Sequence, residues 1–69
     1  MQITAELAGN VWKILKAAGQ SLARDETLMI LESMKMEIPV VAPRAGTVTR
    51  LHVKEGDAVQ EGQLLAELD

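Results

Sequence analysis

The chain of 69 residues contains no cysteine, one aromatic residue (Trp12) and one histidine (His52). Without cysteine there is no disulfide and no thiolate zinc site, and a single histidine argues against a histidine metal site within the chain. Small domains often need such staples, because a short chain buries a small fraction of its surface. The core must therefore come from many small aliphatic residues, in agreement with a hydrophobic content of 48%.

The sequence also lacks a block of like charge and a long apolar run. Ten acidic and seven basic residues give a net charge of -3, which disfavours a protein that holds nucleic-acid phosphates. The N-terminus lacks the basic segment and apolar run of a signal peptide, and no stretch approaches the roughly 18 apolar residues of a membrane span. We therefore expect a cytoplasmic monomer with no nucleic-acid or membrane partner.

What the sequence does contain is an internal repeat with an offset of 37 residues. Among the 28 pairs from 5/42 to 32/69 there are seven identities, whereas roughly two are expected from ordinary residue usage. Two glycine pairs, Gly9 with Gly46 and Gly19 with Gly56, fall in register. Glycine marks places where the backbone must turn, so Gly9 is assigned to a turn and Gly56 is expected to need a positive φ. The repeat predicts two halves with the same fold.

Each half consists of short strand-like runs between turn signals, which is typical of an all-β protein. A helical face is the alternative for residues 11–22, but Gly19 lies inside this segment and its repeat partner is rich in Val and Thr. The pairs Val11/Val48 and Ile14/Leu51 have opposite parity, which predicts a β-bulge or a sheet switch at a position that remains open. We expect one domain, residues 1–69, forming a quasi-twofold eight-stranded β-sandwich or flattened β-barrel.

The duplication leaves residues 33–41 unpaired between the halves. Two strand-like runs, 28–32 and 37–41, flank Ser33-Met34-Lys35-Met36, and the simplest topology is a tight hairpin with Met34 and Lys35 at its tip. The segment has no glycine or Asn-Gly, so turn chemistry alone does not predict the hairpin. A single strand over residues 28–40 is the alternative, although 13 residues exceed the usual strand length of about 3–10.

Lys35 lies at the centre of this segment and offers an amine on a long, flexible arm. Such an amine can form a permanent amide with a carboxylic-acid cofactor, but a lysine amine is protonated at neutral pH. Because the chain supplies no neighbouring base, a separate enzyme must deprotonate it and deliver an activated acyl group. Taken alone, each residue has an ordinary interpretation: Lys35 as a solvated charge, Met34 and Met36 as core residues, and Glu32 and Glu37 as a solvated rim. The position of Lys35 in the one non-duplicated segment is what singles it out.

The segment Glu32-Ser33-Met34-Lys35-Met36-Glu37 resembles the Glu-Ala-Met-Lys-Met hairpin of the biotinyl/lipoyl attachment domain family, in whose biotin carriers the central lysine is biotinylated. Further residues follow the family pattern across the chain: Ala42, Pro43, Gly46, Val48, Val53, Glu55, Gly56, Asp57, Val59, Gly62, Gln63 and Leu65. The resemblance implies a flattened barrel of two four-stranded antiparallel sheets with the cofactor on Lys35. It also implies that Met34 and Met36, together with Glu32, Ser33 and Glu37, are recognised by the ligase or by partner sites.

The two halves match without a gap, which leaves no room for the protruding "thumb" insertion of some biotin carriers, so the resemblance is closer to the carriers without a thumb. The first strand is expected to start almost at Met1, which suggests a free-standing protein or an excised fragment. The resemblance implies a non-catalytic swinging arm. Biotin protein ligase would attach biotin to Lys35 using ATP, a biotin carboxylase would load carbon dioxide, and a carboxyltransferase would pass it on. The tether keeps the cofactor near both active sites.

Two alternatives remain open. A lipoyl ligase would instead place lipoate on Lys35, alone or in addition to biotin, although lipoyl hairpins typically carry Asp-Lys-Ala and both flanks of Lys35 are Met. The other is an unmodified protein-interaction module that uses the hairpin methionines as a docking patch.

An enzyme is not expected, because His52, Ser21 and Ser33 cannot assemble a triad with a pocket in so small a chain. We expect no catalytic residue and no metal site. His52 is predicted to lie on the surface, Trp12 to be partly buried, and Lys54 to stay unmodified in a turn.

Overall fold

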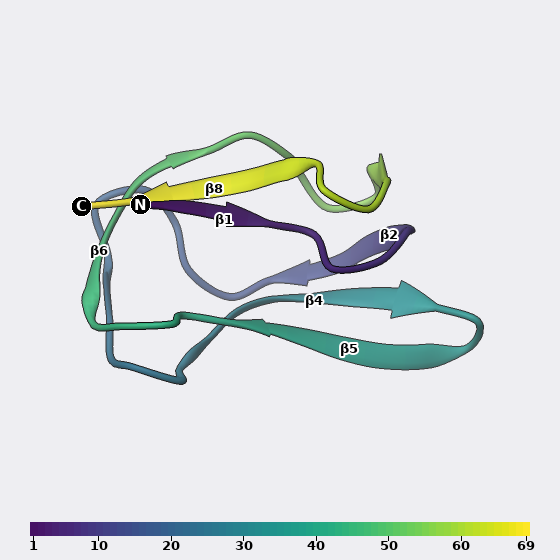
Figure 1. The fold of residues 1–69 in the computed structure, drawn as a ribbon, viewed down its shortest axis with the longest axis horizontal. Helices are drawn as coiled ribbons and strands as arrows, with labels where there is room; N and C mark the ends of the chain where they lie inside the picture. Colours follow the sequence, from purple (N-terminus) through teal and green to yellow (C-terminus); the bar gives the residue numbers. More distant parts are fainter.

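The computed structural model describes residues 1–69 and contains eight strands and no helix. The strands are β1 (Gln2–Thr4), β2 (Gly9–Ile14), β3 (Ser21–Leu22), β4 (Thr27–Ser33), β5 (Met36–Val41), β6 (Gly46–Leu51), β7 (Ala58–Val59) and β8 (Leu64–Leu68). They form two antiparallel sheets, β1-β8-β6-β3 and β5-β4-β2-β7, which lie one above the other (Figure 1). The all-β prediction is confirmed, and residues 11–22 contribute strands rather than a helix.

The repeat is present in the backbone as well as in the sequence. An offset of 37 residues relates β1 to β5, β2 to β6, β3 to β7 and β4 to β8, and this exchange converts one sheet order into the other. Positive φ recurs at the same offset, at Gly19 (92°) and Gly56 (95°). The expectation of a positive φ at Gly56 is therefore confirmed.

The halves are interlocked, because the turns of each half bond to the strands of the other. The Val11 N–H donates to the Asp57 carbonyl at 2.8 Å, and the Gly56 N–H donates to the Val11 carbonyl at 2.8 Å. The related bonds, from Val48 N–H to the Gln20 carbonyl (2.9 Å) and from Gly19 N–H to the Val48 carbonyl (2.7 Å), repeat this exchange. Neither half can therefore keep its hydrogen bonds without the other.

The structure also locates the expected irregularity in each half. The pairing register shifts between Val11 and Lys13 in β2, and between Val48 and Arg50 in β6. A β-bulge inserts one residue and so resets which side chains face the core. It is the bulge that allows Val11 and Ile14, three residues apart, both to pack toward the interior.

The core is entirely aliphatic. Fourteen hydrophobic residues from both sheets are buried, and no polar side chain is buried with them. The largest fully buried side chains are Leu28, Met29, Leu31, Leu65, Val11 and Val48. No helix in the chain is long and apolar enough to cross a bilayer.

Candidate functional site

The segment that we expected to lie unpaired between the repeats is part of a hairpin. Its second strand, β5, is the counterpart of β1, so within residues 33–41 only 33–37 lack a counterpart at the offset of 37 residues. Strands β4 and β5 pair from Thr27 opposite Val41 to Ser33 opposite Met36, so Met34 and Lys35 alone form the loop. The tip extends beyond the rest of the molecule (Figure 1). The predicted hairpin is confirmed, and the single long strand over residues 28–40 is wrong.

The turn has an unusual backbone for its residues. Met34 has a φ of 52° and Lys35 a φ of 65°, and a two-residue loop with positive φ at both positions has the pattern of a type I′ turn. Such turns usually contain Asn-Gly, because a left-handed φ costs a residue with a Cβ about 1–2 kcal/mol. The pairing below the turn imposes it: Leu31, 1% exposed, lies opposite Ile38, which packs against the core.

The tip presents its side chains to solvent. Met34 is 92% exposed, Met36 is 59% exposed, and Lys35 is exposed between them. The two ion pairs of the protein, Lys16 with Glu26 and His52 with Glu67, do not involve Lys35. Both methionines are thus surface residues, and the interpretation of them as core residues is wrong.

Two carboxylates flank the base of the turn. Glu32 and Glu37 lie directly opposite each other in β4 and β5, and both are exposed. Like charges directly opposite each other destabilise a sheet. Ser33 is half-buried and pairs with Met36. The six residues that the sequence singled out therefore occupy the turn and the two strand pairs next to it.

Gly9 supports the site in a way that the sequence analysis missed. It begins β2 rather than forming a turn, and a Cβ at this position would lie 2.7 Å from the Glu32 carbonyl oxygen. The in-register pair Gly9 and Gly46 was the available signal, since Gly46 makes the same close approach, 2.8 Å, to the Asp69 carbonyl. Gly9 lets β2 approach β4 just below the turn.

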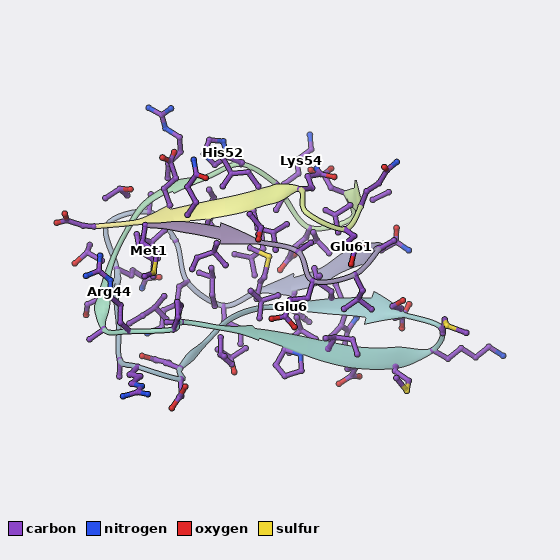
Figure 2. The ribbon with its side chains drawn as sticks, in the orientation of Figure 1. Met1, Glu6, Arg44, His52, Lys54 and Glu61 are labelled. Carbon is purple, nitrogen blue, oxygen red and sulfur yellow. The ribbon has the colours of Figure 1, made fainter.

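The remaining candidates lie away from the tip. His52 is on the surface as expected, on the side of β8 away from the hairpin (Figure 2), with its Nε2 2.7 Å from Glu67 Oε2. This hydrogen bond lowers the pKa of Glu67. Lys54 opens a turn in which its N–H donates to Asp57 Oδ2 at 3.0 Å. Trp12 is an exposed residue, with 43% of its surface accessible, whereas we expected it to be partly buried.

One cavity of about 350 Å³ lies between β1 and β5, and no residue from 32 to 37 lines it. Lys35 therefore has no pocket beside it in this chain. A reaction at its amine needs an active site on another protein, which fits a residue that protrudes into solvent.

Comparisons with known proteins agree with this arrangement. The biotin/lipoyl family model, described as "Biotin-requiring enzyme", matches residues 1–68. The chain is 48% identical over 68 residues to the biotin/lipoyl attachment protein of Bacillus subtilis, covering 99% of this chain and 93% of that protein. It is 41% identical over 64 residues to the biotinylated protein TB7.3 homolog of Mycobacterium leprae, covering 93% and 90% of the two chains.

Other similarities extend to longer enzymes and to lipoyl domains. The chain is 45% identical over 67 residues to pyruvate carboxylase of Bacillus subtilis, covering 97% of this chain and 6% of that protein. The solution structure of the lipoyl domain of the 2-oxoglutarate dehydrogenase complex from Azotobacter vinelandii superposes with a TM-score of 0.85 at 29% identity, covering 100% of this chain and 95% of that one. Together with the two-sheet fold and the protruding hairpin, the match over residues 1–68 shows that the chain belongs to the biotin/lipoyl attachment family, whose members are carrier domains rather than enzymes.

Proposed function

We propose that Lys35 is the attachment residue, that it carries biotin, and that the domain shuttles carboxyl groups between a biotin carboxylase and a carboxyltransferase. The observation that carries this proposal is the two-residue turn, which holds the Lys35 amine in solvent without an ion-pair partner. An amine in this position can enter the active site of a second protein while the folded domain stays outside.

The residues at the tip fit a cofactor that is attached through an amide. Biotin, once attached, supplies the group that carries the carboxyl unit. The chain supplies the amine, its reach and its rigid base, because β4 and β5 are paired up to the residues that flank the turn. Biotin protein ligase must therefore remove the proton from the Lys35 amine and deliver the activated acyl group, because no base of this chain forms an ion pair or hydrogen bond with Lys35.

Recognition falls to the residues around the lysine. Met34 and Met36 are flexible, polarizable and exposed, which suits contact with more than one partner surface. Glu32 and Glu37 form a paired negative charge below them. We assign these four residues and Ser33 to contact with the ligase and the partner active sites.

Lipoate on Lys35 is the second candidate. The similarity to a lipoyl domain over 95% of its length favours it, and the same turn would present a lysine equally well to a lipoyl ligase. The methionines on both sides of Lys35 and the similarity to a biotinylated protein of comparable length favour biotin.

Intact mass tests the proposal. The chain is produced in cells that contain both biotin protein ligase and lipoyl ligase, beside the variants Lys35→Arg and Lys54→Arg. A biotin adduct on the original chain and on Lys54→Arg, and none on Lys35→Arg, is the expected result. A lipoyl adduct would establish the second candidate, and an unshifted mass would leave an unmodified interaction module.

A further inference from the structure

The two sheets share one backbone plan but differ on their outer faces. On the β1-β8-β6-β3 sheet this face is polar: His52 Nε2 lies 2.7 Å from Glu67 Oε2, the Thr49 hydroxyl donates to the Glu67 carbonyl at 3.1 Å, and Arg50 is the register partner of Glu67. Figure 2 shows His52 on this side of the molecule. The polar side chains thus satisfy one another or point into water.

At the related positions of the hairpin sheet, 37 residues earlier, apolar residues replace all but one of them. Thr49 corresponds to Trp12, His52 to Leu15 and Glu67 to Ile30, and only Arg50 has a basic counterpart in Lys13. Gln2, beside Glu67, corresponds to Pro39, beside Ile30. We define the apolar face as Trp12, Leu15, Ile30 and Pro39.

The apolar face is exposed where its polar counterpart is. Trp12 is 43% and Leu15 49% exposed, Pro39 is exposed, and Ile30 is half-buried. The other half of the molecule shows that the same backbone folds with polar residues at these positions. The fold therefore does not require them to be apolar, and exposed apolar patches commonly mark interaction surfaces.

The apolar face is continuous with the hairpin tip. Ile30 lies opposite Pro39, and two residues further along the strands Glu32 lies opposite Glu37, on the same face of the sheet. Three steps along β4 separate Ile30 from Ser33, which is about 10 Å at the usual rise of a strand, and Met34 and Lys35 follow directly in the turn. An enzyme that holds the tip in its active site lies close to this face.

The size and charge of the face indicate the kind of partner. A stable homodimer needs about 800 Å² from each copy, which is out of proportion to four side chains on a chain whose total accessible surface is 4335 Å². A brief contact with a larger protein fits better. The Lys13 ammonium lies 5.6 Å from the centre of the Trp12 ring and forms no ion pair, so the partner surface should combine apolar side chains with a carboxylate.

We propose that the apolar face, with Lys13 at its edge, is a docking surface for the ligase that acylates Lys35, and that it binds an apolar, carboxylate-bearing surface of that enzyme. This inference rests on the proposed function of Lys35. Docking on the sheet lowers the KM for the carrier domain without contributing to the chemical step, because the contact is made equally before and during acyl transfer.

Kinetics with purified biotin protein ligase and the unmodified domain as substrate test the proposal. The variant W12T/L15H/I30E copies the polar face onto the hairpin sheet, and T49A/H52A perturbs the polar face as the matched control. We expect the first to raise the KM for the domain about tenfold or more with little change in kcat, and the control to leave both unchanged. If the triple variant loses its fold by circular dichroism, Trp12→Thr alone serves, since this side chain is exposed.

A binding measurement adds a readout that folding cannot mimic. Trp12 gives the only indole N–H resonance of the chain, and Lys35→Arg prevents turnover. Unlabelled ligase should shift or broaden this resonance together with the hairpin amides. Hairpin shifts without an indole shift would refute the docking surface, and so would an indole that responds to the concentration of the domain alone or to phosphatidylcholine vesicles but not to the ligase.

The two proposals fail in different ways. If neither ligase modifies the original chain, the function of Lys35 is wrong. If the chain is biotinylated and the polar-face variant keeps the original KM, only the docking surface is wrong.

Discussion

The turn at the tip predicts that the residues proposed for cofactor attachment make the folded domain less stable than residues suited to the turn would. Met34 and Lys35 both have left-handed φ values, at about 1–2 kcal/mol for each residue. The variant M34N/K35G installs the dipeptide that adopts a type I′ turn most readily. Met34 is almost fully exposed and gives up no packing. After about 1 kcal/mol is subtracted for the greater freedom of glycine in the unfolded chain, the free energy of unfolding should rise by about 1–3 kcal/mol.

Thermal unfolding followed by circular dichroism measures this gain. For a domain of this size, 1 kcal/mol corresponds to about 4–8 °C in Tm, so the double variant should melt at least about 4 °C higher. Met34→Ala is the control, because it keeps a Cβ in the same backbone conformation and should leave Tm unchanged. A double variant that melts at or below the Tm of the original chain, beside a neutral Met34→Ala, would refute a strained turn.

Two of the three further predictions concern the surroundings of the tip, and the third concerns the opposite sheet. Gly9→Ala places a Cβ 2.7 Å from the backbone oxygen of Glu32, and should lower the free energy of unfolding by about 1–3 kcal/mol; an unchanged urea midpoint would show that β2 and β4 are not tightly spaced. Met36→Ala should slow modification by the ligase while unfolding changes by less than about 0.5 kcal/mol, and a large loss of Tm would make Met36 a core residue. The bond from His52 lowers the folded pKa of Glu67 below its ordinary value of 4.5. The stabilisation is therefore complete above the unfolded pKa and is lost as pH falls through the folded one. Glu67→Gln should flatten the acid side of a plot of Tm against pH, and an identical slope would contradict the role of this pair.

The fold was predictable because its two halves repeat in the sequence. The in-register pair Gly19 and Gly56 reports a turn that both halves need, and the opposite parity of Val11/Val48 and Ile14/Leu51 reports a bulge that both halves contain. The sequence left the position of the bulge open, because parity shows that one residue is inserted without showing which one leaves the ladder.

The candidate site was predictable in place but not in geometry. The position of Lys35 between the repeats located the tip, whereas nothing in Met34-Lys35 favours a left-handed backbone. That conformation comes from the long-range pairing of β4 with β5, which local turn preferences do not contain. The role of Gly9 was missed for a similar reason, since a close approach between strands and a turn both call for glycine and only the three-dimensional packing separates them.

The internal repeat also supplies a control for reading function from this fold. The core and the interlocking turns are held in common by the two halves, so they report the requirements of folding. The two halves also keep a positive φ at equivalent turn positions, although the residues differ: Asp25 in the first half and Gly62 in the second. Met34 and Lys35 have no counterpart within the chain, and Trp12 and Ile30 replace polar residues at equivalent positions. Because the shared backbone does not demand these differences, they are where selection for contact with other proteins can act, and all of them lie on the hairpin sheet.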